Sequence, residues 1–144
     1  MDYTERIAQE VSVLVPKLAV GVWKKFFEIE ELTNRQIIVL MFLYENKSVK
    51  ISDIARGLFV SFPTITGIVD RLVKKGYLLR GRNSKDRRIV YINLSNKGQN
   101  FVKRFKENIR KRWQKILSYL TREEQESYLS ILKKILKTIE EKNA

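Results

Sequence analysis

Residues Ser61 to Lys75 read SFPTITGIVDRLVKK, and this stretch decides the fold. Its apolar residues recur every three or four positions, which is the spacing of one face of an α-helix. They are Phe62, Ile65, Ile68, Val69, Leu72 and Val73. Ser61 is expected to cap this helix, and Pro63 suits its first turn, where the missing N–H of proline costs little.

The opposite face of the predicted helix begins with small hydroxyl side chains and ends with cations. Small hydroxyls let a helix approach base edges, and cations at its flank meet phosphates. This pattern favours a DNA recognition helix in the major groove, although a solvated surface helix would share it. The residues of this helix expected to contact DNA are Ser61, Pro63, Thr64, Thr66, Gly67, Arg71, Lys74 and Lys75.

The segments before this helix complete a helix-turn-helix. Thr33 and Gln36 have the spacing of a capping box, which predicts a helix from there to about Asn46. Residues 47–50 could form a short edge strand. Ser52 is expected to cap a third helix over 52–58, and Phe59-Val60 forms the turn into the recognition helix.

A basic hairpin is predicted after the recognition helix. Gly76 should end that helix, because glycine adopts left-handed dihedrals easily. Two β-like runs follow, at 77–80 and 88–94, with a polar loop over 81–87 between them. Such a hairpin is either a wing whose arginines reach a minor groove or merely a charged, solvated loop. Its candidate DNA-contacting residues are Arg82, Lys85, Asp86, Arg87 and Arg88.

Three long amphipathic segments flank this winged core. The first covers 4–30, where Pro16 predicts a kink or a break. Ser95 should cap a helix over 96–119, and a capping box at Thr121 should begin a last helix to about Glu141. Their apolar stripes suit a helical dimer interface, with an intramolecular three-helix bundle as the alternative.

The predicted fold is therefore mainly α with a small β-hairpin wing, a winged helix-turn-helix flanked by dimerisation helices. The DNA-binding domain covers 32–95, and the helical dimerisation region covers 1–31 and 96–144. No apolar run is long enough to cross a bilayer and no signal peptide opens the chain, so the cytoplasm is the expected location.

Charge and composition restrict the partner and the chemistry. The net charge is +13, divided as −2 over 1–31, +8 over 32–94 and +7 over 95–144. A basic middle segment indicates a polyanion, with nucleic acid ahead of an anionic membrane surface. The chain has no Cys and no His, which excludes disulfides, thiol sensing, imidazole or thiolate metal sites and His-dependent nucleophiles. Neither an enzyme nor a metal or other cofactor is expected.

Several motifs resemble the MarR (multiple antibiotic resistance regulator) family of winged-helix transcription factors, over about residues 7–140. The most specific segment runs from Val69 to Gly98. The matching pieces are Leu32-Thr33-x-x-Gln36-x-x-Val39-Leu40, Ile54-Ala55, Thr64-x-Thr66, Val69-Asp70-Arg71-Leu72, Gly76, Arg80, Asp86-Arg87-Arg88 and Leu94-Ser95-x-x-Gly98.

This resemblance implies a homodimeric regulator, most often a repressor, that binds a palindromic operator in double-stranded DNA. Each recognition helix would enter a major groove, and Asp86 would orient a neighbouring arginine of the wing toward the minor groove. The resemblance also implies a small phenolic or other aromatic effector between the dimerisation helices and the winged domain. Aromatic residues that could line its pocket, or belong to the core, are Trp23, Phe26, Phe27, Tyr44 and Trp113.

Gly67 departs from the family pattern. Many members carry Arg after the second Thr of the recognition helix, where a guanidinium can read guanine. Without that group, base readout falls to Thr64, Thr66 and Arg71. The missing Arg and the high charge also favour an alternative function, a non-specific or architectural DNA-binding protein.

Overall fold

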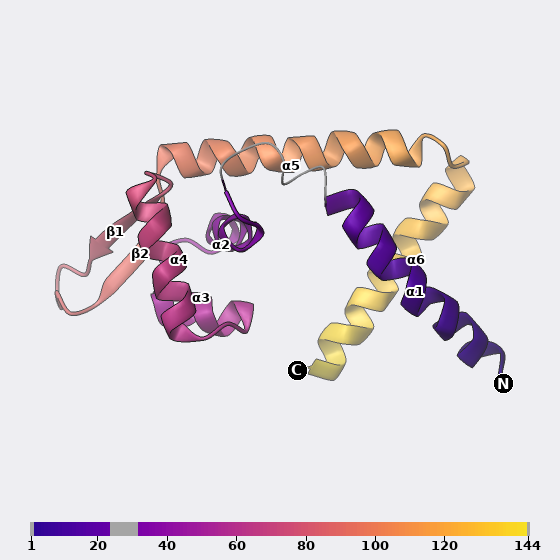
Figure 1. Cartoon of the computed structure of the whole chain (residues 1–144), viewed down its shortest axis with the longest axis horizontal. Helices are drawn as coiled ribbons and strands as arrows, with labels where there is room; N and C mark the ends of the chain where they lie inside the picture. The colour runs from indigo at the N-terminus through magenta and orange to yellow at the C-terminus, as the bar shows by residue number, and fades with distance from the viewer. Residues whose placement is uncertain (1, 24–31, 144) are drawn as a thin grey trace. The chain divides into compact units, whose positions relative to one another are not determined.

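The computed structural model describes residues 2–23 and 32–143, and the chain divides into two compact units, Met1–Lys106 and Glu107–Ala144 (Figure 1). The elements are α1 (Tyr3–Trp23), α2 (Asn34–Glu45), α3 (Ile51–Leu58), α4 (Phe62–Lys74), β1 (Leu78–Arg82), β2 (Val90–Leu94), α5 (Asn96–Leu117) and α6 (Arg122–Asn143). No helix within these described stretches is both long and apolar enough to span a membrane. The predicted fold class, mainly helical with one hairpin, is confirmed.

The core of the first unit lies where α2, α3, α4 and the hairpin meet. Leu40, Ile54, Val69, Leu72 and Ile92 are fully buried there. The predicted capping box begins α2: the Gln36 backbone N–H donates to the Thr33 hydroxyl at 3.3 Å, and Thr33 N–H donates to the Gln36 amide oxygen at 2.9 Å. The buried Gln36 amide oxygen is thereby satisfied, so α2 starts at a fixed point of the core.

The start of α3 differs from the expected cap at Ser52. The helix begins at Ile51, and the Asp53 carboxylate accepts the Lys50 backbone N–H at 3.3 Å. A carboxylate three residues inside the helix therefore takes the capping role. The helix ends at Leu58, and its C-cap residue Phe59 adopts left-handed dihedrals (φ 54°) and is 97% exposed. The α3–α4 turn thus presents an aromatic ring to solvent.

The burial of α4 follows the predicted stripe except at its two ends, where Phe62 is exposed and Val73 is only half-buried. Ile65, Ile68 and Leu72 are buried, but Phe62 is 54% exposed. At 100° per residue, Phe62 lies about 70° from the centre of the buried stripe, at its edge. Ser61 occupies the N-cap position as expected, but its side chain makes no capping hydrogen bond to the backbone.

A Schellman motif ends α4 and leads into the hairpin. Tyr77 N–H donates to Leu72 O at 2.9 Å and Gly76 N–H to Val73 O at 3.0 Å, with Gly76 at φ 81°. Strands β1 and β2 then pair antiparallel, from Leu78 opposite Leu94 to Arg82 opposite Val90. The edge strand expected at 47–50 is reduced to a single bridge between Val49 and Ile92.

The start of α5 is fixed against the hairpin. The Ser95 hydroxyl accepts Gly98 N–H at 3.1 Å and donates to Gly76 O at 2.5 Å, which confirms the predicted cap. Gly98 faces the Tyr77 carbonyl so closely that a Cβ there would lie 2.2 Å from its oxygen. This close approach ties the end of the recognition helix to the first turn of α5.

The flanking helices α1 and α6 expose much of their apolar surface. Of the kink or break predicted at Pro16, the break is wrong, because α1 continues through that residue. The predicted capping box of α6 is confirmed by reciprocal bonds between Thr121 and Glu124. Large apolar side chains that stay exposed on the two helices are Ile7, Val11, Val13, Leu14, Val15, Leu18, Val20, Leu129, Ile131, Leu132, Ile135, Leu136 and Ile139.

Candidate nucleic-acid interface

The exposed face of α4 carries most of the residues expected to contact DNA. Ser61 and Pro63 are exposed at its N-terminal end, and Arg71 and Lys74 are exposed in its last turns, with Lys75 just beyond the helix. Thr64, Thr66 and Gly67 are half-buried between these two ends. The helix therefore presents a neutral N-terminal half and a cationic C-terminal half, as the sequence predicted.

The hydroxyl groups of α4 are largely engaged within the protein. Ser61 Oγ and Thr64 Oγ1 lie 2.8 Å apart and share one hydrogen bond. Thr66 Oγ1 donates to the Phe62 carbonyl at 2.9 Å. Two of the three hydroxyl protons are therefore used, and the Thr66 side chain is held in one rotamer.

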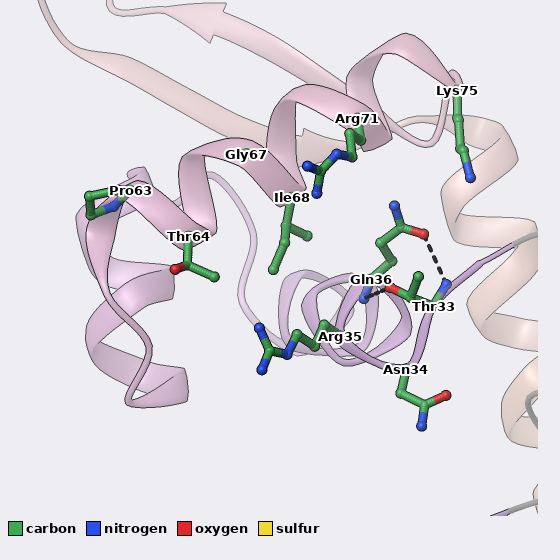
Figure 2. Close-up of a pocket in the computed structure, with 10 residues that line it drawn as sticks. All are labelled: Thr33, Asn34, Arg35, Gln36, Pro63, Thr64, Gly67, Ile68, Arg71 and Lys75. Carbon is green, nitrogen blue, oxygen red and sulfur yellow. Dashed lines mark hydrogen bonds between the residues drawn. The ribbon is translucent and has the colours of Figure 1, made fainter.

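A cleft of about 950 Å³ separates α4 from the N-terminus of α2 (Figure 2). Thr64, Ile68 and Arg71 descend into it from α4, and Arg35 approaches from α2. Asn34 and Arg35 were not among the residues predicted to contact DNA. Their only sequence signal was their place inside the Thr33–Gln36 capping box, which was interpreted as a helix start alone.

The wing is ordered by its own polar groups. Asp86 accepts three hydrogen bonds from Arg88: from the backbone N–H at 3.0 Å, from Nε at 3.2 Å and from Nη2 at 3.3 Å. Arg82 Nη1 donates to the Arg87 carbonyl at 2.8 Å across the loop. Asp86 thus orients the Arg88 guanidinium, which remains 92% exposed. Lys85 and Arg87 are also exposed.

The charge state of Asp86 follows from these bonds. Donation from the Arg88 side chain, then from its backbone, holds the pKa of the Asp86 carboxyl below its usual value. Because the pKa of Asp86 is lower in the folded state, the stabilisation that its charged carboxylate gives to the fold is complete above the unfolded-state pKa. It is lost as the pH falls through the folded-state value. The wing is therefore in its ordered, charged form at neutral pH.

An ion pair joins the recognition helix to the wing. Arg80 on β1 donates through Nη2 to the Asp70 carboxylate on α4. Both side chains are nearly half exposed, so the pair contributes little to stability. It links the side chains of α4 and β1 where the buried Leu72 and Leu78 already pack. The pairing of Arg80 with Asp70, ten apart in sequence, is visible only in the folded chain.

Two of the aromatics expected to line an effector pocket, Tyr44 and Trp113, each border a pocket within their own unit. Tyr44 lines a pocket of about 440 Å³ with Lys47, Asn93 and Lys103, and the Lys106 ammonium lies 4.8 Å from its ring centre. Trp113, in the second unit, lies 6.1 Å from Tyr128 between ring centres and borders a different pocket. Phe26, Phe27 and the side chain of Trp23 lie outside the described residues.

Comparisons of the sequence point to one family. Residues 32–90 match the MarR family. The HTH-type transcriptional regulator YfiV of Bacillus subtilis is 31% identical over 120 residues, which are 81% of this chain and 72% of that protein. The HTH-type transcriptional repressor MdtR of the same organism is 32% identical over 97 residues, covering 67% of this chain and 63% of the repressor.

Solved structures agree in fold. A MarR family protein from Bacillus stearothermophilus superimposes with a TM-score of 0.86 at 22% identity, covering 96% of this chain and 98% of that one. MepR of S. aureus bound to ethidium bromide superimposes with a TM-score of 0.65 at 25% identity, covering 96% and 97%. The winged helix-turn-helix, the matched segment and these relatives identify the chain as a member of the MarR family and a DNA-binding transcriptional regulator.

Proposed function

We propose that the protein is a homodimeric repressor that binds a palindromic operator, placing one α4 in each of two successive major grooves. The observation that carries this is the cationic surface of the first unit. Exposed Arg71 and Lys74 on α4 and Arg88 on the wing belong to elements tied together by the Asp70–Arg80 pair. Residues 32–95 would form the DNA-binding domain, and 1–31 with 96–144 the dimerisation region.

The residues divide by the part of DNA that they would contact. The cations at the end of α4 would bind phosphates. Arg35 would bind a further phosphate, since its side chain lines the same cleft as Arg71. The exposed Arg88, held by Asp86, would enter the minor groove with Arg87 beside it. Ser61, Pro63, Thr64 and Thr66 would lie nearest the base edges.

The salt dependence of binding tests the electrostatic part of this proposal. If about six phosphates are neutralised per complex, the logarithm of affinity should fall with the logarithm of salt concentration at a slope near −5. Fluorescence anisotropy of a labelled duplex measures it. A slope near zero would contradict the assignment of these cations to phosphates.

The alternative, an architectural protein without an operator, draws support from Gly67, which leaves the middle of α4 without a guanidinium. The affinities for a selected site and for random duplex DNA distinguish the two. A regulator binds its site about a thousandfold or more tightly, whereas a coating protein gives a ratio near one.

Homodimerisation is supported by the apolar surface of α1 and α6. Leu14 and Val20 on α1 and Ile131 and Leu136 on α6 are each more than half exposed in the single chain. Exposed apolar side chains of this number on each helix are expected to be covered by a partner. Light scattering should give a mass about twice 17.1 kDa. A mass of 17.1 kDa at micromolar concentration would rule out the dimer.

Repression relieved by an aromatic effector is supported by the relatives. MdtR is named a repressor, and MepR has been solved with the aromatic dye ethidium bromide bound. The pocket beside Tyr44, with Lys47 and Lys103 in its lining, offers aromatic surface and cations suited to a phenolic acid. Operator affinity measured with and without such an acid tests this role, and unchanged affinity across aromatic acids would argue against it.

A further inference from the structure

The N-terminal half of α4 has no side chain able to form a bidentate hydrogen bond with a base. Residues 61–69 read SFPTITGIV, without an amide, guanidinium or carboxylate. Guanine and adenine are usually recognised by two parallel hydrogen bonds from Arg, Lys, Asn or Gln. The N-terminal residues of a recognition helix are those that contact base edges. Another kind of contact must therefore supply specificity here.

The hydroxyl groups of this segment contribute little to the recognition of bases. Ser61 and Thr64 are bonded to each other, and Thr66 Oγ1 donates to the carbonyl of Phe62. Because the Thr66 hydroxyl turns back to its own helix, its methyl group is the part left to face outward. One hydroxyl proton of the Ser61–Thr64 pair stays available, which is too little to distinguish bases.

The charged residues that follow are directed elsewhere. The Asp70 carboxylate is occupied by Arg80. The side chain of Arg71 extends into the cleft between α4 and α2 (Figure 2). Gly67, one turn before Arg71, contributes no side chain, and a Cβ built there would meet no atom within 4 Å. The helix can therefore approach DNA closely along its first two turns.

Apolar surface is what remains at this end of the helix. Phe62 is 54% exposed, although its spacing placed it in the buried stripe, and Pro63 beside it is exposed as well. An exposed aromatic ring at the start of a recognition helix has one partner among the base edges of the major groove, the C5-methyl group of thymine.

We propose that Phe62 is a specificity-determining residue that reads thymine methyl groups in each half-site, assisted by Pro63 and the Thr66 methyl. This inference rests on the proposed binding of α4 in a major groove. It predicts that the operator positions read by α4 are thymines. A contact to thymine would replace the contact to guanine that is lost because Gly67 stands where many family members have Arg.

Deoxyuridine tests the inference, because it pairs as thymine does but lacks the methyl group. Each thymine pair of a symmetric operator, obtained by selection from random DNA, is replaced in turn by deoxyuridine. At one or two positions per half-site the wild-type protein should bind about three- to fivefold more weakly for each methyl lost. Phe62→Ala should lose most of the difference between the thymine and deoxyuridine duplexes, while Phe62→Leu should retain a larger part of it.

Lys85→Ala is the matched control. Loss of a phosphate contact on the wing should weaken binding to both duplexes equally and leave their ratio unchanged. Equal wild-type affinity for thymine and deoxyuridine at every position would overturn the inference and leave DNA binding intact. A ratio in Phe62→Ala as large as that of the wild-type protein would overturn the role of Phe62. Failure to bind any duplex would overturn the proposed function, and the inference with it.

Discussion

Replacing Gly98 by Ala is expected to lower the free energy of unfolding by roughly 3 kcal/mol, the upper end of the range for overpacked sites. The added Cβ would lie 2.2 Å from the Tyr77 carbonyl oxygen and 3.1 Å from Leu94 Cδ2. The Tyr77 carbonyl cannot easily withdraw, because it accepts the Ser95 N–H at 3.0 Å. Relief of the clash would therefore disturb the hydrogen bonds at the start of α5.

Gly67→Ala is the control for this substitution, since it makes the same change inside a helix where the space is open. It should raise the free energy of unfolding by about 0.5–1 kcal/mol, because Ala loses less backbone entropy than Gly in a helix. Urea denaturation followed by circular dichroism measures both. Equal effects of the same sign at the two glycines would refute the tight contact at Gly98.

Replacing Arg88 by Ala is expected to weaken operator binding by about 1–3 kcal/mol in free energy while the fold persists. The guanidinium is 92% exposed and, within residues 2–23 and 32–143, makes its hydrogen bonds only with Asp86, so its loss leaves the core intact. Its proposed place is the minor groove, where the negative potential favours arginine. Gel-shift or anisotropy titration of the selected operator gives the change in affinity.

Arg122→Ala is the matched control for the wing variant. Arg122 is 91% exposed on α6 and pairs with Glu126 one turn away, so the two variants lose the same charge from equally exposed sites. Affinity should remain within about twofold, since an exposed charge with no proposed DNA contact is screened by salt. If the two variants weaken binding equally, the wing is not a DNA contact and the net charge alone drives binding.

Local sequence signals determined most of the secondary structure. Both capping boxes, at Thr33 and Thr121, were visible as residue pairs three apart, and their hydrogen bonds form as expected. Gly76 ends α4 by the predicted left-handed conformation, and the hairpin follows it. These features depend on residues within one or two turns, which is why spacing alone could find them.

Features that depend on distant residues could not be read in this way. Phe62 has the spacing of a buried residue, but only the packed helices reveal that the edge of the stripe is exposed. The cleft that Arg35 and Arg71 both line is formed by segments more than thirty residues apart in the sequence. Pro16 does not break α1, because a long helix can tolerate the one backbone hydrogen bond that proline removes.

Selection of bound sequences from random duplex DNA tests the central claim most directly. A dimer presents two copies of α4 and of the wing, related by two-fold symmetry. The selection should therefore recover a palindromic consensus with half-site centres about 10 base pairs apart. Thymines should dominate the positions nearest the start of each α4. Enrichment of no sequence, or of an asymmetric site of a single half, would contradict a dimer that reads DNA through paired recognition helices.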